Sequence, residues 1–217
     1  MLNVAILLYD RFTALDAMGP YEVLSRLRDA RVTFVAEQPG PVTTDTRMLS
    51  LVAEQSLAEV PHPDLVLVPG GPGQEQQLTS APVLDWLRAA DAASSWTTSV
   101  CTGSLILAAA GLLDGRQATS HWLALDRLAD FGAVPTAERV VIDGKYVTGA
   151  GVSAGIDMAL TLAGRIGGQD AAQAIQLMLE YAPEPPYHAG SPRTAPPDLV
   201  ARLRIGSRHT TASKVAG

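Results

Sequence analysis

The sequence has a single cysteine and no long hydrophobic run. With Cys101 alone among 217 residues, an intramolecular disulfide is excluded, and this suits a reducing compartment. No apolar segment approaches the ~20 residues that cross a bilayer. No basic flank with a cleavage site accompanies the first apolar run. We therefore expect a cytoplasmic protein without a membrane partner.

Positive charge is also scarce. The net charge of -6 and the pI of about 5.1 provide no general attraction to nucleic acid or to an anionic surface. The exception is a locally basic stretch with Arg202, Arg204, Arg208 and Lys214, which is typical of a solvated chain end. We expect residues 198–217 to form a tail that is helical or flexible.

Internal repeats and low-complexity tracts are absent, and no linker precedes the proline-rich segment that starts at Tyr181. A composition of 47% hydrophobic and 18% charged residues suits a packed globule. We therefore predict one domain over residues 1–197.

Short apolar runs alternate with segments of helical spacing along the chain. The runs predict strands over 4–9, 32–36 and 65–68, and we also expect a strand over 96–100, leading to Cys101, and a hairpin over 139–148. The helical spacing predicts helices over 20–29, 83–93, 104–110, 122–131, 154–166 and 171–179. Residues 42–57 are ambiguous between a small hairpin and an edge strand. The alternation predicts a single-domain, three-layer α/β/α sandwich with a mostly parallel sheet, which is a flavodoxin-like or glutamine amidotransferase-like fold. Functional groups should gather at the carboxyl ends of the strands, in the turns after Tyr9, Val68 and Val100.

Cys101 stands in one of these turns, where a buried strand ends and a helix begins. With Gly103 two residues later, the segment resembles a nucleophile elbow. The helix start favours the thiolate over the thiol, so we expect a nucleophilic cysteine. The competing interpretation is a small buried hydrophobe.

Two further turns at the same edge supply candidate partners. Asp16 is the candidate proton donor and acceptor, or alternatively the cap of the helix that contains Pro20. Gly70, Gly71 and the backbone of Thr102 are candidate N–H donors for developing charge, although turn glycines have the same pattern. 

His121 either completes a Cys/His pair or forms a structural hydrogen bond. The other histidines, His62, His188 and His209, lack metal-ligand spacing, and we expect no metal.

Two glycine patterns fall short of nucleotide-binding fingerprints. Gly71-Pro72-Gly73 is followed by Gln76 where a third glycine is required. Gly149-Ala150-Gly151 with Ala154 fits the pattern, but Asp170 stands between predicted helices and not at a strand end. We expect no nucleotide cofactor.

Several motifs resemble the ThiJ/PfpI superfamily, and within it most closely the isocyanide hydratases. They are Leu15-Asp16 with Gly19-Pro20, Pro69-Gly70-Gly71, 99–104, 111–113, 119–122, 138–141, 154–157, 179–183 and 189–192. The resemblance covers nearly everything from Val4 to Pro196. It implies a cysteine at the elbow, with Asp16 as the carboxylate hydrogen-bonded to it.

The resemblance also implies an activity and an assembly. It implies a homodimer that hydrates an organic isocyanide to an N-substituted formamide without a cofactor. The alternatives are a glyoxalase-like carbonyl enzyme and a redox-sensing stress protein. Peptidase-like members have His directly after the cysteine, where this chain has Thr102. Related regulators append a helix-turn-helix domain, for which we expect no room before Gly217.

Overall fold

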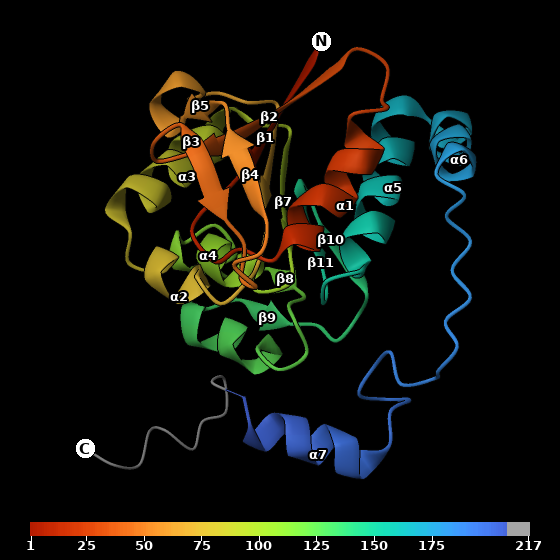
Figure 1. The fold of residues 1–217 in the computed structure, drawn as a ribbon. Coiled ribbons are helices and arrows are strands. Elements are labelled where there is room, and N and C mark those ends of the chain that lie inside the picture. The colour runs from red at the N-terminus through yellow and green to blue at the C-terminus, as the bar shows by residue number, and fades with distance from the viewer. Residues whose placement is uncertain (208–217) are drawn as a thin grey trace.

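A seven-stranded sheet lies at the centre of the computed structural model, which describes residues 1–207 (Figure 1). Its strands, in spatial order, are β10 (Val140–Asp143), β11 (Tyr146–Gly149), β7 (Trp96–Val100), β6 (Leu65–Val68), β1 (Leu2–Leu7), β2 (Ala30–Ala36) and β5 (Gln55–Ser56). All run parallel except β10, which pairs antiparallel with β11. Parallel strands are covered on both faces, which explains why β6 is apolar and buried throughout.

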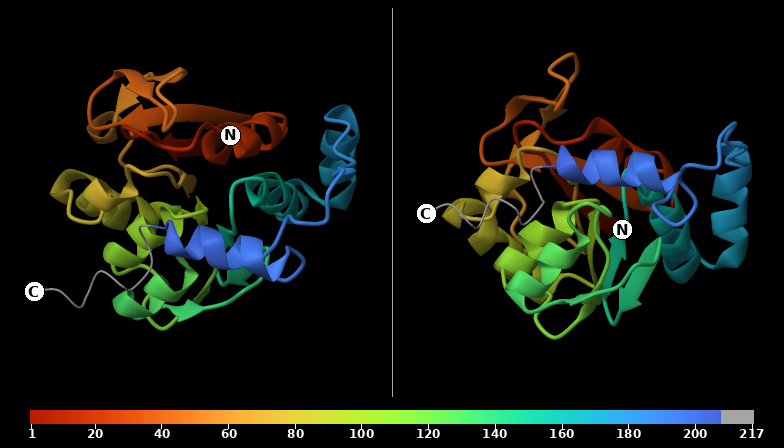
Figure 2. Two further views of the ribbon diagram at one scale, coloured as in Figure 1. Left: turned by 60° about the horizontal axis from the view of Figure 1, so that its bottom comes forward. Right: turned by 90° about the horizontal axis from the view of Figure 1, so that it is seen from below.

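Helices cover both faces of the sheet (Figures 1 and 2). On one face lie α1 (Ala14–Leu24) and α5 (Ala154–Gly167), with α6 (Gln169–Met178) packed outside α5. On the other face lie α2 (Gln74–Gln77), α3 (Ala81–Ala93), α4 (Gly103–Ala109) and the 3₁₀ helices η1 (Leu57–Glu59) and η2 (Leu125–Phe131). The expected three-layer α/β/α fold with a mostly parallel sheet is confirmed.

The ambiguous segment contains both expected elements. Strands β3 (Gly40–Thr43) and β4 (Ser50–Ala53) form an antiparallel hairpin, and β5 then joins the sheet edge. The helix predicted over 122–131 is instead the shorter η2, which ends at left-handed Gly132. The paired strands β8 (Gln117–Ala118) and β9 (Val134–Pro135) flank it.

The first helix differs most from its prediction. It starts at Ala14, six residues before Pro20, and Pro20 lies inside it. The proline ring lies against α5, since a Cβ on Gly155 would come within 3.2 Å of it. Tertiary packing therefore holds proline within a helix, where it removes one backbone hydrogen bond. As a result Asp16 lies in the first helical turn, with Thr13 as the N-cap residue, and the alternative interpretation of Asp16 as the helix cap is wrong.

After α6 an extended segment leads to α7 (Pro197–Ile205), which lies beside the carboxyl end of the sheet (Figures 1 and 2). The Arg204 guanidinium stacks over the Trp122 ring at 5.5 Å. Arg208, His209 and Lys214 of the expected tail lie outside the described residues. Within residues 1–207 no helix is long and apolar enough to cross a membrane.

Candidate active site

Cys101 occupies the turn between β7 and α4 with φ of +58°. This left-handed conformation costs a non-glycine residue about 1–2 kcal/mol. Hydrogen bonds hold it in place: the Cys101 N–H donates to the carbonyls of Gly149 and Ala150, and its carbonyl accepts from the hydroxyls of Ser104 and Ser120 at 3.1 Å. The surrounding chain thus fixes the thiol in a strained turn, as at a nucleophile elbow.

Two glycines allow the neighbouring backbones to meet at this turn. A Cβ on Gly70 would lie 2.5 Å from the Thr102 nitrogen and 2.8 Å from the Cys101 Cβ. A Cβ on Gly103 would lie 2.1 Å from the Val68 carbonyl oxygen. Only glycine therefore lets the turn after β6 approach the turn after β7.

Gly103→Ala should destabilise the protein by about 1–3 kcal/mol or more, because the new methyl group overlaps the backbone of β6. Alanine has the better helix propensity by about 1 kcal/mol, so propensity alone predicts the opposite sign. Urea unfolding measures the difference. Gly190→Ala is the matched control, since no atom of residues 1–207, apart from its two chain neighbours, lies within 4 Å of its Cβ position. Equal stability of the two variants would contradict the overlap.

Asp16 brings a fully buried carboxyl group to the same point. Its Oδ2 accepts the Gly70 N–H at 2.9 Å, its Oδ1 is buried without a hydrogen-bond partner among the described residues, and the Cys101 thiol lies close enough to influence its pKa. Burial raises the pKa of Asp16 from 3.8 to about 7, although the Gly70 N–H and the thiol oppose the rise. A carboxyl group with a pKa near neutrality can both give and take a proton at physiological pH.

The pKa of the Cys101 thiol is raised, as is that of the Asp16 carboxyl group. Burial, and then the negative charge of Asp16, raise the pKa of Cys101, although the N–H groups of Thr102 and Val152 favour the thiolate. The sequence predicts the opposite shift from the helix start, but α4 is short and the sulfur is buried. Asp16 and Cys101 therefore gain and lose protons as a coupled pair.

The raised pKa of Asp16 should make the protein less stable as pH rises. The unfolded carboxyl ionises near 3.8 and the folded one near 7, so the folded state binds the extra proton between these values. Stability present below pH 3.8 is then lost as pH rises through 7, by up to about 4 kcal/mol. Asp16→Asn should remove this loss, so its advantage over wild type in urea unfolding should grow from pH 4 to 7 and then level off.

The exposed Asp130→Asn variant supplies the same chemical change outside the site. Its free energy of unfolding should stay within about 0.5 kcal/mol of the wild-type value, as is usual for a surface substitution. A constant difference between Asp16→Asn and wild type across the range would contradict the raised pKa.

The backbone N–H groups of the glycine turn have partners in the structure. Gly70 donates to Asp16, and Gly71 donates to the Thr102 hydroxyl oxygen at 3.0 Å. From the sequence, both glycines are expected to direct free N–H groups at a point beside the thiol. Instead, these two N–H groups hold Asp16 and Thr102 in place. The Thr102 hydroxyl accepts from Gly71, which leaves its own proton as a donor.

His121 lies near the turn that joins β11 to α5. Its Nδ1 accepts the Leu123 N–H at 3.3 Å, and a Cβ on Gly151 would lie 2.9 Å from the ring. Sequence reasoning missed its neighbour Ser120 and the residue Val152, whose N–H favours the thiolate. Neither residue carries a sequence signal, because both act through contacts made only in the folded chain.

Three motif segments that are distant in sequence meet at the start of α5. The Arg139 guanidinium donates to Asp157 and to the Ser153 hydroxyl, and the Tyr181 hydroxyl donates to Asp157 at 3.0 Å. The Arg139 carbonyl accepts the Ala150 N–H. This cluster braces the turn that contacts Cys101.

Within residues 1–207, no three side chains of His, Cys, Asp or Glu come close enough to hold a metal ion. The chemistry that this arrangement offers is nucleophilic addition by sulfur together with proton transfer by a buried carboxyl group.

Comparison with known proteins places this geometry in a family. The model of the DJ-1/PfpI family matches residues 2–165. The chain is 46% identical to the isonitrile hydratase of Pseudomonas putida over 94% of its own length and 89% of that protein. It is 36% identical to the HTH-type transcriptional regulator CdhR of Pseudomonas aeruginosa, over 68% of this chain and 44% of the regulator. The crystal structure of a ThiJ/PfpI family protein from Pseudomonas syringae superposes with a TM-score of 0.92 at 39% identity, covering 94% of this chain and 85% of that one. The chain belongs to the DJ-1/PfpI family.

Proposed function

We propose that this protein is a lyase that hydrates an organic isocyanide, also called an isonitrile, to the N-substituted formamide. The observation that carries the proposal is the pair of Asp16 and Cys101, which are both buried and which shift each other's pKa. The similarity to an isonitrile hydratase over nearly the whole chain supports the choice of substrate.

In the first step the Cys101 sulfur attacks the terminal isocyanide carbon, while the proton shared with Asp16 moves to that carbon. The product is a thioimidate, and Asp16 is left as a carboxylate. Asp16 then takes a proton from water as the oxygen adds to the same carbon. As the carbonyl forms, the hydroxyl proton passes to nitrogen and the thiolate leaves, which returns the pair to its starting state. The Thr102 hydroxyl, which accepts the Gly71 N–H, then donates its own proton to the substrate nitrogen in this proposal.

The test is direct incubation of the protein with several alkyl and aryl isocyanides. Proton NMR should detect the formyl hydrogen of the formamide. The value of kcat/KM should rise with pH through about 7, because the pair reacts with one shared proton and not with two. No formamide from any isocyanide would end the proposal.

The same geometry favours turnover over redox sensing. A sensor cysteine is exposed and has a low pKa, whereas Cys101 is 5% exposed and its pKa is raised. We also infer, from the family resemblance, that the protein is a cytoplasmic homodimer that needs no cofactor. Light scattering coupled to size-exclusion chromatography tests the dimer.

A further inference from the structure

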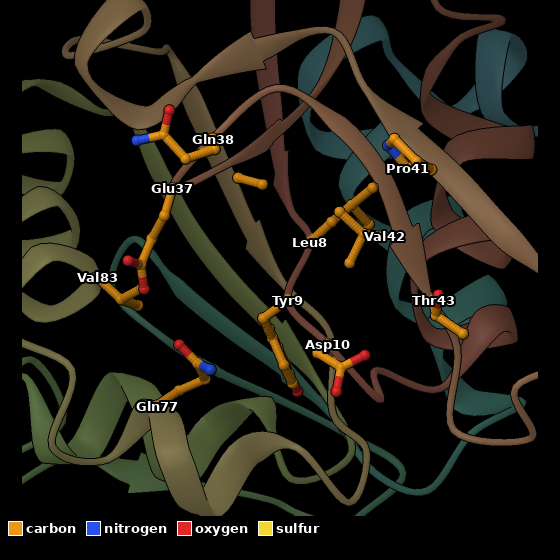
Figure 3. A pocket seen from close by; sticks show the side chains of 11 residues that line it. Leu8, Tyr9, Asp10, Glu37, Gln38, Pro41, Val42, Thr43, Gln77 and Val83 are labelled. Atoms are coloured by element: carbon orange, nitrogen blue, oxygen red, sulfur yellow. The ribbon is translucent and has the colours of Figure 1, made fainter.

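A second cavity lies at the carboxyl ends of β1 and β2, on the side of α2 and α3 (Figure 3). Its volume of about 370 Å³ falls in the range of small-molecule sites. The β3 segment of the hairpin forms part of its wall. The lining residues are Leu8, Tyr9, Asp10, Ala36, Glu37, Gln38, Pro41, Val42, Thr43, Gln77 and Val83.

The cavity is separate from the Cys101 site, although both lie at the same sheet edge. Tyr9 stands between them, because its hydroxyl donates to the Pro69 carbonyl at 2.7 Å. The Arg11 carbonyl accepts the Gly73 N–H, and this bond joins the loop after β1 to the loop after β6. Nothing in the proposed hydration uses this second space.

Gln77 is the polar group that most needs a partner here. The residue is only 8% exposed, and its Oε1 atom is buried without a hydrogen-bond partner among the described residues. An unsatisfied buried acceptor costs about 1–3 kcal/mol. In Figure 3 the Gln77 amide and the Glu37 carboxylate turn toward each other at one side of the cavity, with Leu8 and Val42 across from them.

The charges of the lining have one sign. Asp10 and Glu37 are both acidic, no lysine or arginine lines the cavity, and neither carboxylate forms a salt bridge with a described residue. Glu37 accepts one hydrogen bond, from the Ser80 hydroxyl at 3.1 Å. The opposite wall is apolar.

We propose that this cavity binds a small organic ammonium ion. An ammonium group has three donors and no acceptor, so it satisfies the Gln77 Oε1 atom and the Glu37 carboxylate together. The apolar body of the ligand then packs on Leu8, Val42 and Val83. A metal ion is a poorer match, since the cavity offers only two carboxylates and the described residues hold no metal cluster.

Calorimetric titration with probes of similar size tests the sign of the charge. Phenethylammonium and hexylammonium should bind at least about tenfold more tightly than 2-phenylethanol or phenylacetate, because hydrogen bonds to charged groups are the stronger ones. Added salt should weaken the ammonium binding. Equal binding of ammonium and alcohol, or no saturable binding of either ammonium, would overturn the proposal.

Two variants place the binding in this cavity. Glu37→Gln, on an exposed side chain, and Gln77→Leu, which removes the unpaired acceptor, should each weaken phenethylammonium binding by about tenfold. Glu54→Gln is the matched control, because Glu54 is exposed and does not line the cavity, and it should bind as wild type does. Unchanged binding in Glu37→Gln, whose fold is checked by circular dichroism, would place the ion elsewhere and refute the assignment.

Discussion

Cys101→Ser should lower isocyanide hydration by at least about 10³-fold, because the proposed reaction passes through a covalent bond to sulfur. Serine keeps the size of the side chain, but an alcohol is a much weaker nucleophile than a thiol that shares a proton with Asp16. The measurement is the rate of formamide formation under saturating isocyanide.

The fold of this variant is checked by urea unfolding, and the turn should persist because its backbone hydrogen bonds do not use the sulfur. Since Cys101 is the only cysteine, alkylation offers a second readout on the wild type. The fraction of protein alkylated should equal the fraction of activity lost. Activity within tenfold of wild type in Cys101→Ser would rule out the covalent route.

Asp16→Asn should lower the hydration rate by about 10²–10⁴-fold while making the thiol easier to ionise. The two effects have different causes. The rate falls because no group delivers a proton to carbon, whereas the thiol pKa falls because the negative charge of Asp16 no longer opposes the thiolate. Iodoacetamide should therefore react with Cys101 at a lower pH in the variant than in wild type.

A slower hydration together with a lower thiol pKa distinguishes the loss of proton transfer from structural damage. A variant that merely disordered the turn would lose activity without a consistent shift in thiol pKa. Asp45→Asn is the matched control, because Asp45 lies near Asp16 and accepts the Thr13 hydroxyl and the Thr46 N–H on its two oxygens, and asparagine keeps one of these acceptors. It should hydrate isocyanide at nearly the wild-type rate. Equal losses in both variants would assign the effect to the loop and not to the carboxyl proton.

The strands that position the candidate site could be predicted closely from the sequence. The predicted strands over 65–68 and 96–100 match β6 and β7. The apolar sequence of β6 follows from burial on both faces, whereas β7 contains the buried polar residues Thr97, Thr98 and Ser99 and is marked by the turn that follows it. The same local rules located the turns that carry Gly70 and Cys101. They failed at Pro20, where packing against α5 outweighs the usual helix limit, and at α2, which is too short to show a period.

The sequence by itself determined the fold class, the order of the strands along the chain and the presence of Cys101 at a strand-to-helix turn, because these follow from local hydrophobic period and turn residues. Tertiary structure alone decided the state of the site. Burial depends on every neighbouring element, so only the folded chain reveals that the Asp16 pKa rises to about 7 and that the Cys101 pKa rises with it. The partners of the Gly70 and Gly71 N–H groups, and the unpaired Gln77 in the second cavity, likewise depend on contacts between segments far apart in the chain.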